Sequence, residues 1–244
     1  MRTGALAWRQ FRFERRQFWR NPSAAFFNFL LPLVFLLLFA SVFADDAEQL
    51  DILIPGIAGM SVMATTFSAL AFNVTFLREE GILKRIHGTP IPAGAYFAGF
   101  LGSAALNAVV QVVLVIAIGN VLYGVDWPAD WFGVAVFTAL GVACFGALGI
   151  AMSHAIPNFD AAPAYVNAVF LPLIFISGVF YESRDLPVVL EDVAEVLPLK
   201  HVIDGLSGAI VTGEGIGGSW SALVVVAAWT AFGLFAAIRW FRWE

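Results

Sequence analysis

The sequence predicts an all-α polytopic membrane protein, and three observations carry this prediction. Of the 244 residues, 60% are hydrophobic and only 13% are charged, whereas a soluble domain has about 45–50% apolar and about 25% charged residues. The mean hydropathy is +0.84. The apolar residues also gather in runs of about 20, the length that an α-helix needs to cross a bilayer. We therefore expect one membrane domain, residues 1–244.

Six runs meet this length, and each is interrupted by few polar residues. The predicted spans are residues 24–44, 52–77, 93–122, 131–153, 163–180 and 220–241. The segment 181–219 is too charged to cross, so both termini are expected on one side of the membrane.

The distribution of basic residues predicts which side that is. Eleven of the 13 Lys and Arg residues precede the first span, lie between the second and third spans, or stand at the end of the sixth span or after it. The loops 45–51 and 123–130 contain only acidic charges. Because cytoplasmic loops carry an excess of Lys and Arg, the protein is expected in the cell (plasma) membrane, with cytoplasmic termini and an extracellular 181–219 segment.

Composition also excludes several kinds of site. A single cysteine, Cys144, excludes a disulfide scaffold and a Cys-rich metal centre. Three histidines offer little for a catalytic or metal site, and a net charge of −5 does not favour nucleic acid as a partner. We assign no catalytic, cofactor-binding or metal-binding residue.

Residues 1–23 are expected to form a cytoplasmic amphipathic helix. On a helical wheel, an aromatic sector lies beside an arginine sector, which is typical of a helix in the membrane interface that contacts lipid. Within the aromatic sector, Arg15 could extend its guanidinium to the headgroups. The other interpretation is that the basic residues only set the topology. The residues that define the helix are Trp8, Phe11, Arg12, Arg15, Arg16, Phe18 and Trp19.

The loop after the second span has an unusual pattern. Glu80 and Lys84 have the favoured acid-before-base spacing of four residues on a helix. An apolar stripe of Ile82, Leu83 and Ile86 accompanies them and could pack into a groove on a cytoplasmic partner. The alternative is a helix that lies on the membrane surface.

Three blocks of sequence resemble type-2 ATP-binding-cassette (ABC) exporter permeases, most of all their drug-exporter branch. The stretch R-E-E-G-I-L-K-R-I-H-G-T-P-I-P, residues 78–92, is similar to the coupling-helix signature of that family. The second block is L-P-L-I-F-I-S-G-V-F at 171–180 with L-P-L-K-H-V-I-D-G-L at 197–206. The third block is R-N-P at 20–22 with F-x-x-P-L at 29–33. Two departures are Ile82, where Thr is common, and Ser207, where Arg often stands.

The resemblance implies a coupling helix in the cytoplasm and an outer re-entrant segment. It also implies two paired six-span halves, either identical or different chains, each above a separate ABC ATPase subunit that binds ATP and Mg. The chain has no G-x-x-x-x-G-K-[ST] phosphate loop, in agreement with a separate ATPase. The implied coupling residues are Arg78, Glu79, Glu80, Gly81, Ile82, Leu83, Lys84, Arg85, Ile86, Thr89 and Pro90.

The outer segment 186–211 is expected to be helical without crossing. The spacing of Leu186, Val189, Leu190 and Val193 suits an amphipathic helix that dips into the outer leaflet or closes a pathway.

The expected function is the membrane subunit of an ATP-driven exporter for a hydrophobic or amphiphilic substrate such as a drug, lipid or glycolipid. No charged residue lies inside spans one to five, which argues against an ion-coupled carrier. A stand-alone carrier or channel and a non-transporting scaffold remain alternatives. Candidate pathway residues, which could equally bond between helices or face lipid, are Asn28, Asn73, Asn107, Phe170, Phe175 and Phe180.

Overall fold

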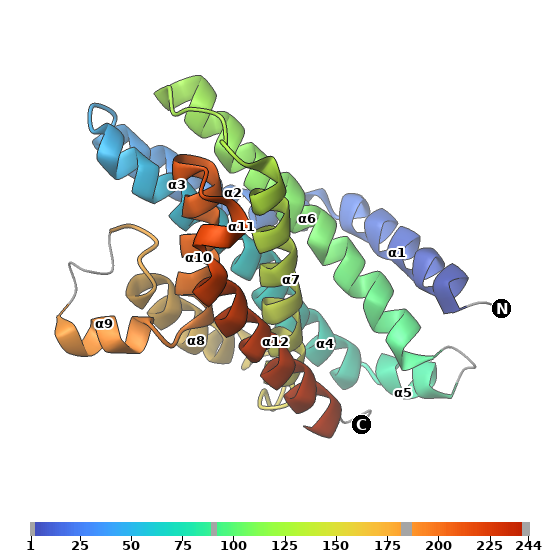
Figure 1. Ribbon diagram of the computed structural model, residues 1–244. Coiled ribbons are helices and arrows are strands. Elements are labelled where there is room, and N and C mark those ends of the chain that lie inside the picture. Colours follow the sequence, from blue (N-terminus) through green and yellow to red (C-terminus); the bar gives the residue numbers. More distant parts are fainter. Residues whose placement is uncertain (1–2, 89–91, 182–186, 241–244) are drawn as a thin grey trace.

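The computed structural model describes residues 3–88, 92–181 and 187–240, and every regular element in these ranges is helical (Figure 1). The elements are α1 (Thr3–Arg20), α2 (Pro22–Val42), α3 (Ala47–Met63), a π-helical segment (Ala64–Ser68), α4 (Ala69–Glu79), α5 (Ile82–His87), α6 (Ala93–Tyr123), α7 (Trp131–Ser153), α8 (Ala162–Ile176), α9 (Val188–Ala194), α10 (Pro198–Ser207), a second π-helical segment (Gly208–Thr212), α11 (Gly215–Gly218) and α12 (Trp220–Trp240).

Four helices among the described residues are long and apolar enough to cross a membrane. They are Ala47–Glu79, Gly94–Tyr123, Trp131–Ser153 and Trp220–Arg239. These helices correspond to four of the six predicted spans, and the prediction for residues 131–153 has the same bounds as α7. Asp130 begins α7 because its carboxylate accepts a hydrogen bond from the Phe132 amide at 3.0 Å, which satisfies a free N–H group of the first turn.

The other two predicted spans correspond to shorter apolar helices, Asn28–Val42 and Ala162–Ile176. The predicted fifth span, 163–180, is too long at its end, because α8 stops at Ile176. The reason is Gly178, whose φ of 76° is left-handed and turns the chain. At 15 residues, α8 is about 22 Å long, less than the thickness of a hydrocarbon core of about 30 Å.

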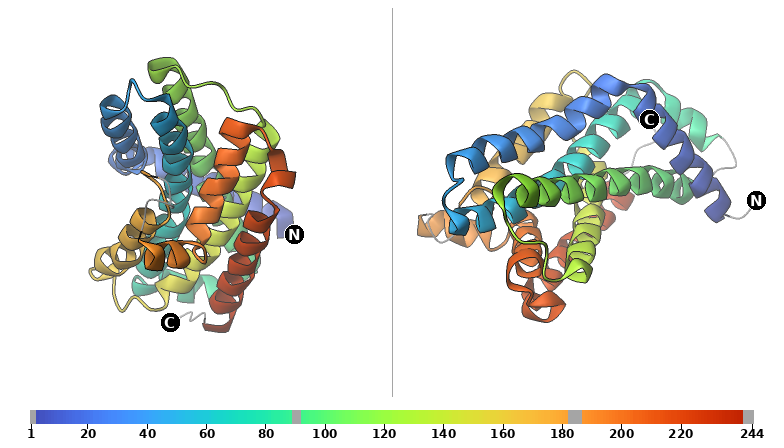
Figure 2. Two further views of the ribbon diagram at one scale, coloured as in Figure 1. Left: turned by 60° about the vertical axis from the view of Figure 1, so that its left-hand side comes forward. Right: turned by 90° about the horizontal axis from the view of Figure 1, so that it is seen from above.

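Helix α3 forms the centre of the bundle. It packs against α2, α6, α7 and α10, and its residues from Leu53 to Met63 are all buried. A helix that is apolar on all sides is expected in such a position. On one flank α12 runs along α7 (Figures 1 and 2).

The segment predicted to lie on the outer side forms two helices, α9 and α10, and not one amphipathic helix. Helix α10 is part of the core: Leu199, Val202 and Leu206 are fully buried, and α10 packs on α3, α7 and α12. Of the two expected positions for this segment, the membrane interface does not hold for α10, because its apolar face packs in the core; closure of a pathway stays a prediction. Pro198 separates the two helices at the first position of α10, where a missing N–H group costs nothing.

The start of α10 lies deep along α12. The Trp229 indole N–H, near the middle of α12, donates to the Val196 carbonyl at 2.8 Å. The chain thus enters the bundle to about half the length of α12 and returns along α10.

Candidate functional site

Helices α4 and α5 meet at a sharp corner. Gly81, between them, has a φ of 65°, a left-handed conformation that glycine adopts without steric cost. Figure 1 places α5 at the end of the bundle where the C-terminus lies. We call this the α5 end. Thr89 and Pro90, which belong to the predicted coupling set, lie outside the described residues.

The apolar stripe of α5 packs against this chain itself. Leu83 is fully buried and clusters with Val74 of α4 and Tyr96 of α6. Ile86 and Phe97 pack against the same cluster. The prediction that Leu83 enters a groove on a partner is therefore wrong, because the start of α6 folds back over the stripe.

Hydrogen bonds of Arg78 and Glu79 hold the corner against the loop between α7 and α8. The Arg78 guanidinium donates to the carbonyls of Ser153 at 2.8 Å and Ile156 at 2.5 Å. The Glu79 carboxylate accepts from the Phe159 amide at 2.5 Å. Carbonyls at the end of a helix lack partners within that helix, so Arg78 acts as a cap on α7. The corner therefore contacts α6 and α7 as well as α4.

An exposed surface remains on the far side of the corner. Glu80, Lys84 and Arg85 are exposed and Ile82 is half-buried. We call these four residues the α5 surface. It presents both signs of charge around an apolar residue, and a partner can reach it.

Helix α1 lies along α6, which the wheel of a single helix could not show. A Cβ atom on Gly99 of α6 would lie 2.7 Å from the Ala7 carbonyl of α1, so the two backbones are close. Arg15 donates to the Asn107 side chain of α6, and its guanidinium lies 5.2 Å from the centroid of the Phe18 ring. Arg15 therefore points to α6, and the expectation that it reaches the headgroups is wrong.

The rest of the predicted interface set divides between two faces of α1. Phe11 is half-buried, with its ring 3.5 Å from the Cβ position of Gly102. Trp8 and Trp19 are 57% and 64% exposed. Arg12 and Arg16 are exposed. The outer face of α1 thus keeps the mixture of tryptophan and arginine that suits a membrane interface.

The three candidate asparagines line one polar cavity of about 330 Å³ between α1, α2, α4 and α6. Asn73 donates to the Ala69 carbonyl at 2.7 Å, and Asn107 accepts from Arg15. Glu14, which was not among the predicted site residues, also lines this cavity. Burial raises the pKa of the Glu14 carboxyl, and a hydrogen bond from Gln10 partly opposes the shift. The amphipathic spacing of the sequence alone did not indicate Glu14 as a site residue.

The three candidate phenylalanines lie elsewhere. Phe170 is buried in the core, and Phe175 is 53% exposed. The Phe180 ring is 4.6 Å from that of Phe39 on α2, centroid to centroid. None of the three lines the polar cavity, so the six pathway candidates do not form one surface in this chain.

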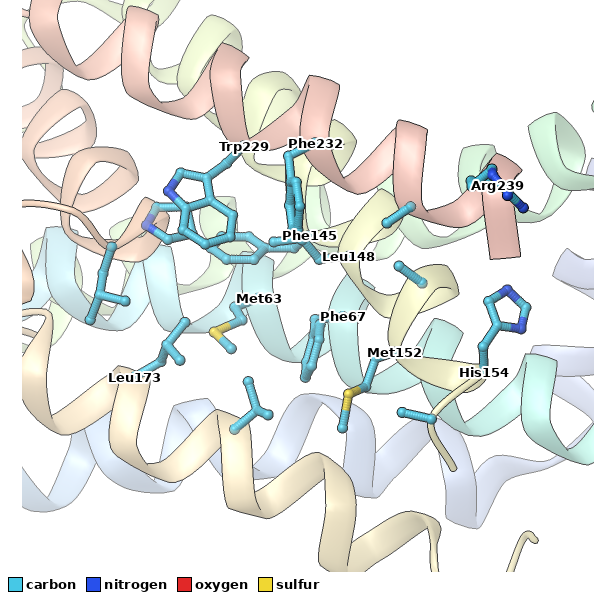
Figure 3. A pocket seen from close by; sticks show the side chains of 16 residues that line it. Met63, Phe67, Phe145, Leu148, Met152, His154, Leu173, Trp229, Phe232 and Arg239 are labelled. Atoms are coloured by element: carbon cyan, nitrogen blue, oxygen red, sulfur yellow. The ribbon is translucent and has the colours of Figure 1, made fainter. Parts of the chain in front are cut away.

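A larger apolar cavity of about 760 Å³ lies on the other side of the bundle (Figure 3). Its lining comes from α3, the first π-helical segment, α7, α8, α10 and α12, together with Leu197 just before α10 and the turn after α7. No sequence pattern indicates this cavity, because residues from so many separate segments form no local pattern.

Comparison with known proteins identifies the family. The family model described as ABC-2 type transporter matches residues 1–211, from α1 through α10. The chain belongs to the ABC-2 type transporter family. It is a multi-pass membrane protein, and the resemblance inferred from residues 78–92 is confirmed.

Several curated ABC-2 relatives show the same level of similarity. Nodulation protein J of Rhizobium meliloti is 24% identical over 66% of this chain and 61% of its own length. The inner membrane transport permease YadH of Escherichia coli is 24% identical over 65% and 61%. The daunorubicin resistance ABC transporter permease protein DrrB1 of Streptomyces coeruleorubidus is 26% identical over 70% and 63%. The matched region thus spans less than two thirds of each relative.

Proposed function

We propose that this ABC-2 permease is the membrane subunit of an ATP-driven exporter and that a separate ABC ATPase docks on the α5 surface. The observation that carries the proposal is the braced corner: the segment similar to the coupling signature ends in an exposed surface and is tied to three helices behind it. Movement of α5 is then transmitted to α4 through Gly81, to α6 through Leu83 and to α7 through Arg78.

The full transporter in this proposal contains two copies of the chain, each with six spans that include α2 and α8, and two ATPase subunits. The cargo is a hydrophobic or amphiphilic molecule. Two relatives are named for daunorubicin resistance and for nodulation, which supports export of a small organic molecule. A stand-alone carrier would work without an ATPase, so the test below separates the two.

Charge reversal on the α5 surface tests the docking. We expect Glu80→Lys with Arg85→Glu to leave membrane levels unchanged, because exposed pairs contribute only about 0.2–1 kcal/mol to folding. Association with the ATPase should fall about tenfold or more, since charges left unpaired in an interface are costly. The measurement is co-purification of a co-expressed ABC ATPase, followed by export of a fluorescent drug or lipid from cells.

The control is Arg12→Glu on the exposed face of α1, which reverses one charge away from the α5 surface, as Arg85→Glu does on it. Unchanged ATPase binding and export in the reversed variant would contradict the proposed docking site. Export that continues in cells lacking every candidate ATPase would instead support a stand-alone carrier.

The proposed topology has the α5 end in the cytoplasm. In a Cys144→Ala background, we expect Asp126→Cys to react with an impermeant maleimide added to intact cells. Lys84→Cys should react only after permeabilisation. Both positions are exposed, so access to the reagent depends on the side of the membrane. The reverse pattern of labelling would overturn the orientation.

A further inference from the structure

The apolar cavity has the size and the lining of a site for an apolar molecule. Figure 3 shows Trp229 and Phe232 of α12 on one side and Leu173 of α8 on the other, with Met63 and Phe67 between them. Its volume of about 760 Å³ lies within the range of about 300–1,000 Å³ that is usual for small-molecule sites. The walls are therefore suited to hydrocarbon and aromatic groups.

The two ends of the cavity differ in chemistry. Leu197 and Pro198 line the end near the middle of α12, where the hydrogen bond from Trp229 to the Val196 carbonyl holds the chain in place. Arg239, an exposed residue in the last turn of α12, and His154, just after α7, line the other end from opposite sides (Figure 3). No acidic side chain is found among the described residues that line the cavity.

The length of the cavity matches one leaflet. Trp229 and Arg239 are ten residues apart on α12, about 15 Å along a helix, which is half of a hydrocarbon core of about 30 Å. The Arg239 end lies at the α5 end of the bundle, beside the C-terminus (Figure 1). In the orientation proposed above, the cavity lies in the cytoplasmic leaflet, with Arg239 at the depth of the headgroups.

We propose that this cavity binds one anionic phospholipid of the cytoplasmic leaflet. The phosphate of the headgroup contacts Arg239, because a guanidinium presents paired donors that fit a phosphate group, and one of the two acyl chains occupies the space between α8 and α12. Anionic lipids are concentrated in that leaflet. The lipid is a bound component that fills the space between these two helices, a role separate from the cargo that the transporter would move.

Native mass spectrometry of lipids retained by the purified protein tests this proposal. The chain is reconstituted with its ATPase into nanodiscs of phosphatidylcholine alone or mixed with equal parts of phosphatidylglycerol, and is then released into mild detergent. We expect one phosphatidylglycerol per chain to be retained in preference to phosphatidylcholine. Arg239→Gln should reduce that retention about tenfold, the effect of losing one charged hydrogen-bond partner.

A second variant tests the apolar part of the site. Ala151→Trp places a large ring in the cavity and should also abolish retention of phosphatidylglycerol. Ala228→Trp is the control for bulk, since Ala228 is exposed on α12 and does not line the cavity. Arg85→Gln is the control for charge, because Arg85 is exposed and does not line the cavity. Both controls should retain the lipid, and size-exclusion profiles report whether each variant is folded.

Each outcome bears on the proposal. Equal retention of the two lipids by the unmodified protein would overturn recognition of the anionic head. Retention of phosphatidylglycerol by folded Arg239→Gln and Ala151→Trp would place the lipid elsewhere on the surface. Because the readout is bound lipid, it is independent of whether the ATPase docks on α5 or export occurs.

Discussion

Replacing Gly56 with valine is expected to destabilise the folded bundle strongly. A Cβ atom on Gly56 would lie 2.1 Å from the Val179 carbonyl oxygen, which is a backbone atom that cannot rotate away. Gly56 is in the middle of the buried helix α3, so neither backbone can shift without disturbing the core. Overpacking of this kind costs about 1–3 kcal/mol or more.

The measurement is the apparent melting temperature of the purified chain in detergent, with the yield of monodisperse protein as a second readout. Gly56→Ala should be damaging and Gly56→Val more so. The matched control is Gly94→Val in the first turn of α6, where a Cβ atom meets nothing within 4 Å. Equal melting temperatures for the Gly56 and Gly94 variants would show that the close approach of α3 to residue 179 does not constrain the fold.

Arg78→Gln is expected to separate ATP hydrolysis from export. The substitution removes the charged hydrogen bonds to the carbonyls of Ser153 and Ile156; bonds to charged groups contribute about 1.5–3 kcal/mol each. The loop after α7 then loses these two hydrogen bonds to α4, while Glu79 of α4 still accepts from the Phe159 amide. Because the α5 surface is unaltered, the ATPase should still bind and hydrolyse ATP, while the amount of cargo exported per ATP falls severalfold.

Hydrogen exchange of residues 154–161 provides the structural readout, and it should become faster in Arg78→Gln. Arg78→Lys is the informative companion, because a lysine keeps the charge without the planar pair of donors; we expect it to recover export only in part. If Arg78→Gln exports normally for each ATP hydrolysed, transmission of motion from the α4–α5 corner to α7 is not needed for coupling.

Properties that depend on neighbours along the chain could be predicted from the sequence. The bounds of α7 follow from a continuous apolar run that begins after the capping residue Asp130. The family resemblance of residues 78–92 depends only on the order of residues, and the family match confirms it. The end of α8 was misplaced by four residues because Ser177–Phe180 is as apolar as a helix, and the left-handed Gly178 that ends it has no hydropathy signal.

Tertiary structure alone decided which of these residues remain available for function. Leu83 and the other apolar positions of α5 have the same spacing whether they face a partner or their own chain, and only the return of α6 shows that Leu83 is buried. Likewise, Arg78 and the Ser153 carbonyl are 75 positions apart. The polar cavity, the apolar cavity beside Arg239 and the core position of α10 all arise from contacts between distant segments. Helix periodicity defines which residues share a face, but the packing of one helix on another determines what that face meets.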